Sequence, residues 1–87
     1  MTIDSLNMHI SIHSIRQTLF EGEAEKLICR TPQGQITVLD HHLPMISLIT
    51  GPFVEAVDPA GEATRIPMAG GFLEVQPGSR VVILAGS

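Results

Sequence analysis

The sequence predicts an all-β fold, a small antiparallel two-sheet β-sandwich or flattened barrel of about eight to ten short strands. Three observations support this prediction. Apolar and polar residues alternate over several short segments, and turn signals that contain Gly, Pro or Asp recur roughly every 8–12 residues. No stretch has the apolar spacing of a long amphipathic helix.

Length and composition predict one small domain, part of whose apolar surface contacts a partner. The chain has 87 residues, and we expect a loose N-terminus over residues 1–7 and one domain over residues 8–87. Its hydrophobic content of 44% and mean hydropathy of +0.28 exceed what so small a domain can bury, so part of the excess is predicted to face a partner. A single cysteine, Cys29, permits no internal disulfide and indicates a reducing compartment; we expect its thiol to be buried and inert.

Charge excludes several classes of partner. The net charge of −4 argues against a nucleic-acid partner and against an anionic membrane surface. The N-terminus lacks the pattern of a secretory signal, and the longest apolar run, residues 81–85, is far too short to span a bilayer. The expectation is a soluble, cytosolic-type domain without direct membrane insertion.

The first part of the chain is predicted to hold two strands. Met8, Ile10 and Ile12 alternate with polar residues, which is typical of a half-buried strand. Residues 14–19 are irregular, and Phe20 returns to the core. Residues 23–30 are predicted to form one strand, which ends before a Thr-Pro pair.

Short strands and turns follow in the middle of the chain. Pro and Gly predict a turn over residues 32–35, a polar loop over residues 40–44 and a turn over residues 58–61. Gly51-Pro52 is predicted to break the apolar segment before it from the strand after it. The expected strands are 36–39, 45–49, 53–57 and one that places Thr64, Ile66 and Met68 on one face. Pro67 puts that last strand at an edge or a bulge.

The most regular segment is a hairpin from Gly70 to Ala85. Residues 76–79, with Pro77 and Gly78 in the centre, predict a type II turn that needs a positive φ at the glycine. Gly70 and Gly71 indicate a close approach of the backbone. The final strand, residues 81–85, is apolar on both faces, so we expect one face to contact another chain.

Residues with reactive side chains do not form a recognisable catalytic pattern. His9 and His13 share a strand face but lie about 13 Å apart, too far to share a metal. The Asp-His-His run at residues 40–42 offers an acid and imidazoles, but no second ligand cluster accompanies it. Ser47 lacks a nucleophile elbow, and Gly70-Gly71 lacks the residues of a phosphate loop. A solvated strand edge is the interpretation of Glu21, Glu23 and Glu25. We therefore expect no catalytic residue, cofactor or metal site.

The segment GGFLEVQPG followed by VVILA closely resembles the closing hairpin of the N-terminal domain of the epsilon subunit of F-type rotary ATP synthases. Residues 9–12 look like the opening strand of that domain, and residues 20–26 resemble its second-strand signature. Residues 34–46 resemble its loop pattern, with His42 and Pro44 on the histidine and proline. The resemblance covers about residues 8–86.

Some residues depart from the family pattern. Gln35 stands where the family usually has an acid, Thr37 where it has a glycine, and Asp40-His41 where it has Pro-Gly. Leu43 replaces a small residue. The family continues into a C-terminal helical hairpin that does not follow here, so the resemblance implies the sandwich domain alone.

The resemblance implies a non-catalytic central-stalk (rotor) subunit that couples the gamma subunit to the membrane c-ring during ATP synthesis and ion transport. It implies no cofactor and a peripheral place in the complex, at the cytoplasmic face of the inner (plasma) membrane. Towards gamma it places Ser14, His42 and Ser47. Towards the polar loops of the c-ring it places Pro32, Gln33, Gly34, Gln35, Asp40 and His41.

Two other hypotheses stay open. The chain could be a free-standing small β module that binds an unrelated protein or ligand. It could also be an enzyme that uses the Asp40-His41-His42 loop.

Overall fold

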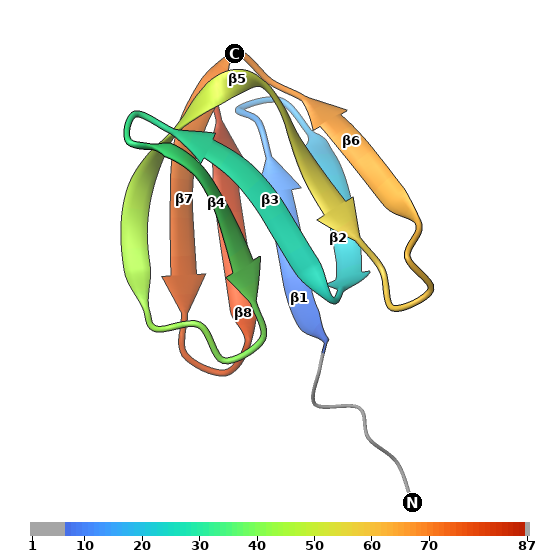
Figure 1. Cartoon of the computed structure of the whole chain (residues 1–87). Helices are drawn as coiled ribbons and strands as arrows, with labels where there is room; N and C mark the ends of the chain where they lie inside the picture. The colour runs from blue at the N-terminus through green and yellow to red at the C-terminus, as the bar shows by residue number, and fades with distance from the viewer. Residues whose placement is uncertain (1–6, 87) are drawn as a thin grey trace, which may run out of the picture.

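The computed structural model describes residues 7–86. Within these residues all regular secondary structure is β-strand (Figure 1). The predicted loose terminus over residues 1–7 falls, apart from Asn7, outside these described residues. The eight strands are β1 (Met8–His13), β2 (Thr18–Ala24), β3 (Lys26–Thr31), β4 (Gly34–Leu39), β5 (Met45–Val57), β6 (Ala63–Pro67), β7 (Gly70–Gln76) and β8 (Arg80–Ala85).

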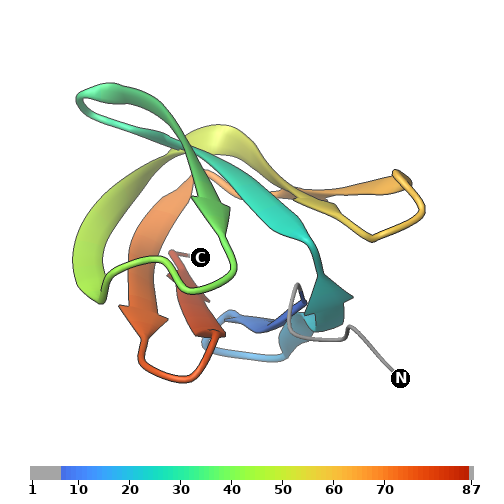
Figure 2. The ribbon, with the colours of Figure 1, turned by 60° about the horizontal axis from the view of Figure 1, so that its bottom comes forward.

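The strands form one sheet that curls into a half-barrel, which Figure 2 shows from below. Its order is β2-β1-β8-β7-β5-β3-β4, and β6 pairs with β5 beside this path. One layer contains β2, β1, β8, β7 and the first half of β5; the other contains the second half of β5 with β3, β4 and β6. The predicted all-β sandwich is confirmed. Its pairs are antiparallel except that β1 and β8 run parallel.

Strand β5 belongs to both layers, which corrects the predicted break at Gly51-Pro52. Before that pair, Met45–Thr50 lies against β7; after it, Phe53–Val57 lies against β6. The Gly51 N–H donates to Ala69 O at 3.1 Å, and Pro52 O accepts from Met68 N–H at 2.9 Å. Because these backbone groups are satisfied across the bend, the chain changes layer there without leaving the sheet.

A second correction concerns residues 23–30, which do not form one strand. The chain bends at Glu25, so that β2 ends at Ala24 and β3 begins at Lys26. The Glu25 N–H donates to Val57 O at 2.7 Å, which fixes the bend against the end of β5. Residues 18 and 19, predicted as irregular, already belong to β2.

Alternation of side chains fills the space between the layers. Met8, Ile10 and Ile12 all point inwards with 1% exposure or less, as their spacing predicts. Burial of each such side chain contributes about 1.5–3 kcal/mol before entropy is subtracted. The partly buried Phe20 packs against one core cluster, to which both layers contribute. The residues of this cluster are Met8, Ile10, Ile12, Ala24, Leu27, Cys29, Val38, Ile49, Val54, Ala56, Ile66, Met68, Leu73, Val75, Val81 and Ile83.

The β7–β8 hairpin agrees with the predicted backbone requirements. Gly78 has a φ of +82°, the sign that the expected turn needs, and Ser79 also has a positive φ of +56°, which the sequence did not indicate. At Gly71 a Cβ atom would lie 2.2 Å from Leu84 O, so the predicted close approach is present. This approach lets β7 and β8 pair as far as Gly71 and Ala85.

Strand β6 lies at an edge of the sheet, as Pro67 predicts. Among the residues that the structure describes, it pairs only with β5, and Pro67 itself is exposed. Of the three residues expected to share a face, Ile66 and Met68 are buried, whereas Thr64 is exposed.

Candidate interaction surface

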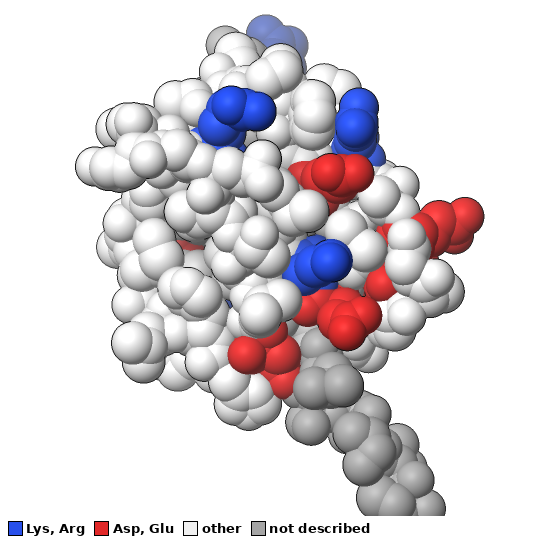
Figure 3. All heavy atoms as spheres, viewed as in Figure 1, with Lys and Arg blue, Asp and Glu red and all other residues white. Residues whose placement is uncertain are grey.

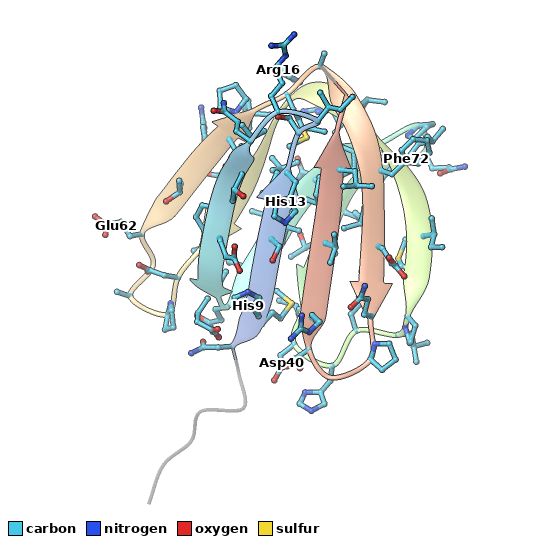
Figure 4. The ribbon with its side chains drawn as sticks, turned by 180° about the vertical axis from the view of Figure 1, so that it is seen from behind. His9, His13, Arg16, Asp40, Glu62 and Phe72 are labelled. Atoms are coloured by element: carbon cyan, nitrogen blue, oxygen red, sulfur yellow. The ribbon has the colours of Figure 1, made fainter. Side chains whose placement is uncertain are left out.

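The outer face of the β5–β7–β8 layer carries exposed apolar side chains. Ile46 and Leu48 lie on β5, Phe72 on β7 and Leu84 on β8, and Ile15 lies in the turn between β1 and β2. Each is more than half exposed, and Ile15 reaches 92%. We call these five residues the apolar strip; Figure 4 shows Phe72 projecting outward from β7.

Strand register places three members of the apolar strip side by side. Leu48 is the partner of Phe72, and Phe72 is the partner of Leu84, so three neighbouring strands present one apolar row. Their sequence neighbours Ile49, Leu73 and Ile83 point into the core. Apolar residues on both faces of a strand are therefore the signal that could have found these positions in the sequence.

Hydrogen bonds of Ser14 hold Ile15 in place at one end of the strip. The N–H groups of Arg16 and Gln17 both donate to Ser14 Oγ at 3.2 Å, and Ser14 N–H donates to Gln17 O at 2.8 Å. A hollow of about 300 Å³ lies between this turn and the end of β8. The lining of this hollow is mostly apolar and includes Ile15 and Leu84.

Beside the strip, strands β1 and β2 present a polar and acidic area. His9 Nε2 lies 3.1 Å from Glu21 Oε2, and its Nδ1 lies 3.2 Å from Glu23 Oε2. Both contacts raise the pKa of His9 above its ordinary value, because the carboxylates favour the imidazolium; the contact with Glu23 has the larger effect. His9 and His13 both lie on the outward face of β1 (Figure 4).

The three residues that the resemblance places towards gamma do not form one cluster. Ser14 lies in the β1–β2 turn, where its hydroxyl group is used within the turn. His42 lies in the β4–β5 loop, and its Nδ1 is 2.8 Å from Leu43 O. The Ser47 hydroxyl donates to Leu48 O at 3.0 Å, and its cross-strand partner is the buried Leu73, so Ser47 lies on the inner side of β5.

The residues placed towards the c-ring divide between two ends of β4. Pro32, Gln33, Gly34 and Gln35 are all exposed at the β3–β4 turn. Asp40 follows the opposite end of β4, roughly 17 Å from Gln35 at the usual rise of a strand. Figure 1 shows the two places at opposite ends of the strand.

Asp40 is largely buried and fastens its loop to the β7–β8 turn. Its side chain is only 7% exposed, and its Oδ1 accepts a hydrogen bond from the Ser79 hydroxyl group. His41 Nδ1 lies 2.9 Å from Asp40 Oδ2 without the angle of a hydrogen bond, and the His41 side chain is 75% exposed. His41 also has a positive φ of +66°. The hydrogen bond between Ser79 and Asp40 joins residues 39 positions apart, and the sequence did not reveal it.

The described residues offer neither an exposed thiol nor a metal-binding group. Cys29 is buried as predicted, and burial raises the pKa of its thiol to about 12. Within residues 7–86, no group of three His, Cys, Asp or Glu side chains could hold a metal ion. The same residues contain no helix long and apolar enough to cross a membrane.

The family model and the curated relatives that match this chain point to the same protein family. The family model of the ATP synthase delta/epsilon chain β-sandwich domain matches residues 7–87. The chain is 36% identical over 76 residues to the ATP synthase epsilon chain of Bordetella avium, covering 87% of this chain and 54% of that one. It is 40% identical over 72 residues to that of Psychrobacter cryohalolentis, covering 83% and 51%. The chain thus spans about half the length of these curated relatives.

Solved structures agree on the fold. A chain in the Euglena gracilis mitochondrial ATP synthase structure, described as OSCP/F1/c-ring, superposes with a TM-score of 0.85 at 17% identity. That match covers 92% of this chain and 51% of the other. A chain in the Tetrahymena thermophila mitochondrial ATP synthase central stalk and c-ring gives a TM-score of 0.73 at 7% identity, covering 92% and 63%. At such identities the likeness concerns the fold alone.

Proposed function

Because the chain belongs to the family of the ATP synthase delta/epsilon chain β-sandwich domain, we propose that it is a non-catalytic central-stalk subunit of an F-type ATP synthase. In this proposal residues 8–87 form the epsilon-like domain that couples the gamma subunit to the c-ring during ATP synthesis. The complex would hold it as a peripheral part on the cytoplasmic face of the membrane. The proposal requires no cofactor bound by this chain.

The apolar strip is the observation that carries this proposal. An exposed apolar row across three strands is costly in water, and contact with a partner removes it from solvent. We propose that gamma covers the strip, with Ile15 as a fixed contact at its end. In this arrangement Ser14 acts by holding the turn, and His42 lies at the far end of the same sheet.

The exposed β3–β4 turn is our candidate for the c-ring contact. Pro32, Gln33, Gly34 and Gln35 are uncharged and accessible, which suits contact with polar loops. Asp40 would contribute indirectly, because its side chain is buried against Ser79. His41 remains accessible at the opposite end of β4 and is a separate candidate contact.

Three leucines allow a matched test of the gamma contact. Leu48 and Leu84 are members of the strip with 52% and 56% exposure, and Leu39 lies on β4 in the other layer with 51% exposure. All three lie in strands, where threonine is well tolerated. We expect the double variant Leu48→Thr/Leu84→Thr to lose at least about tenfold in affinity for the gamma subunit of the same synthase, and Leu39→Thr to keep it.

Affinity would be measured by calorimetry on the 87-residue chain, with far-UV circular dichroism as the check on folding. Equal loss in both variants would argue against the strip as the contact. No binding of the unmodified chain to gamma would overturn the rotor proposal and favour the free-standing β module. Any hydrolase activity lost in a His41→Ala/His42→Ala variant would instead favour the enzyme hypothesis.

A further inference from the structure

The outer face of the second layer holds a groove of about 270 Å³, and Gln35 is the residue that it shares with the contacts proposed above. Arg30 on β3 and Arg65 on β6 both line it, with Phe53 and Glu55 of β5 also in its wall. Gln35, at the start of β4, closes the end nearest the β3–β4 turn. The groove therefore lies on a different layer from the apolar strip.

Strand register explains why charged side chains meet on this face. Glu55 on β5 is the cross-strand partner of Arg65 on β6, and Arg30 on β3 is the partner of Gln35 on β4. The neighbouring residues Cys29 and Ile66 point into the core, so the side chains of Arg30 and Arg65 point outward.

Arg65 is positioned by the wall of the groove without being neutralised by hydrogen bonds. Its guanidinium carbon lies 4.5 Å from the centre of the Phe53 ring, a cation–π distance. Its Nε lies 3.7 Å from Glu55 Oε2, which is an ion-pair distance but too long for a hydrogen bond. The side chain stays 65% exposed, so its donors remain available to a ligand.

Arg30 has no acidic partner at all in the part of the chain that the structure describes. Its side chain is exposed beside Gln35, whose amide adds neutral hydrogen-bonding groups. A guanidinium presents a planar fork of donors that matches a carboxylate. Two such forks flanking one groove favour a ligand with two carboxylates rather than a single small ion.

The distribution of charge over the molecule supports an acidic ligand. The face of β3 and β6 carries Lys26, Arg30 and Arg65, three of the five basic residues in a chain of net charge −4. Figure 3 shows basic side chains on the upper part of this face and another lower down beside acidic ones, and most of the acidic side chains lie lower and to the right. Glu55 is the acid within the groove, and beside Arg30 and Arg65 it leaves the lining with an excess of positive charge.

We propose that this groove binds an acidic segment of a partner protein, with one carboxylate on Arg30 and another on Arg65. Phe53, in the wall of the groove, would contact the peptide chain between the two carboxylates. The site would give the domain a second docking face, chemically unlike the apolar strip. It stands independently of the gamma contact, because it uses different residues in the other layer.

A peptide titration followed by NMR tests the proposal on the isolated chain. The probe is the blocked peptide acetyl-Gly-Asp-Gly-Glu-Gly-amide, and the matched control is acetyl-Gly-Asn-Gly-Gln-Gly-amide. We expect saturable shifts of the side-chain Nε–H signals of Arg30 and Arg65, much weaker with the control peptide. Binding should fall as salt rises, because surface ion pairs are screened.

Variants distinguish a site from general attraction to positive charge. Arg30→Gln and Arg65→Gln should each weaken binding by about fivefold, whereas Arg80→Gln, an exposed arginine on the other layer, should leave it unchanged. Each variant would first be checked for an unchanged backbone spectrum. If Arg65→Gln fails this check because its contact with Phe53 is lost, Arg30→Gln alone carries the test.

Several results would overturn the proposal. Equal shifts with the amide peptide, or equal shifts at Arg16 and Arg80, would show that no acidic-segment site exists. Binding of inorganic phosphate but not of the acidic peptide would assign the groove to phosphoryl groups instead. The Leu48→Thr/Leu84→Thr variant should bind the acidic peptide normally, so failure of the gamma contact and failure of this site are separable.

Discussion

At Gly71 the backbone of β7 approaches β8 so closely that a side chain has no room. A Cβ atom would lie 2.2 Å from Leu84 O and 3.0 Å from Ala85 Cα, both backbone atoms that cannot rotate away. We expect Gly71→Ala to lower the free energy of unfolding by more than about 2 kcal/mol, since the two strands must separate to admit the methyl group.

Gly22 provides the matched control for that substitution. It also lies in a strand, but a Cβ there would meet only the Phe20 ring, at 3.6 Å, an ordinary contact. Gly22→Ala should be neutral or stabilising by up to about 0.5–1 kcal/mol, because alanine loses less entropy in a strand. Urea unfolding followed by circular dichroism measures both. Equal loss of stability in the two variants would contradict the steric explanation.

His9 should make stability depend on pH. Its pKa is raised in the folded chain by Glu23 and Glu21, so folding favours the protonated ring. The stabilisation is therefore fully present below the unfolded pKa of about 6.5 and is lost as pH rises through the higher folded pKa. Since the His9 side chain is 35% exposed and both glutamates are over half exposed, solvent screening limits the effect to about 0.2–1 kcal/mol.

The comparison of the unmodified chain with His9→Gln isolates this effect from the other histidines. The stability difference should be larger at pH 5.5 than at pH 8.5, and Glu23→Gln should lower the titration midpoint of His9 in an NMR titration. A stability difference that does not change with pH would show that the two carboxylates do not hold the imidazolium.

Local residue chemistry was predictable where it depends on nearby sequence. The positive φ of Gly78 followed from its place after Pro77, and the burial of Cys29 followed from its apolar neighbours. The contact of Asp40 with Ser79 could not be predicted, because it joins two loops that only the folded sheet brings together. The use of the Ser14 hydroxyl within its own turn was likewise missed.

At the scale of the elements, we expect β8 to be the most protected strand and β6 the least. Strand β8 is paired on both sides, by β1 and β7, and Val81 and Ile83 have no exposed surface. Strand β6 is paired only by β5, and residues 63–65 are exposed. Local opening is easiest where few buried contacts are lost.

Amide hydrogen exchange followed by NMR checks this order. Among amides that donate within the sheet, those of β8 should exchange at least about 100-fold more slowly than those of β6. The edge strand β2 should fall between them, because Ala24 is fully buried at its end. Equal protection of β6 and β8 would indicate that the chain opens only by global unfolding.

Element boundaries were predicted less well than element types. Sequence patterns placed most strands correctly, because alternation of apolar residues reports burial on one face. The bend at Glu25 has no Gly or Pro to mark it, since it depends on a hydrogen bond to Val57 O. Gly51-Pro52 has the strongest breaker signal in the chain, yet β5 continues because Ala69 and Met68 complete its backbone hydrogen bonds.

For the whole molecule, one core shared by both layers predicts cooperative unfolding. Residues of β1 and β8 and residues of β3 and β4 belong to the same buried cluster, so neither layer retains its core if the other separates. Urea curves from far-UV circular dichroism and from methyl NMR signals of each layer should coincide. Earlier loss of the signals of Leu27 and Val38 would show that the second layer unfolds separately.

The two outer faces differ in chemistry, and only one of them could be predicted. The apolar excess and the apolar final strand predicted a partner surface, and the structure shows exposed apolar side chains gathered in the apolar strip. The groove between Arg30 and Arg65 joins residues from β3 and β6, which are not neighbours in the sheet, so no local pattern marks it.

The parallel pairing of β1 with β8 also decides how the domain responds when its two ends are pulled apart. A force applied at Met8 and at Ala85 runs along both strands in opposite directions and loads their ladder in shear. The bonds between the strands then share the load and must fail together, whereas an antiparallel terminal hairpin would unzip one bond at a time. Single-molecule stretching should therefore find a stiff, brittle element between Met8 and Ala85.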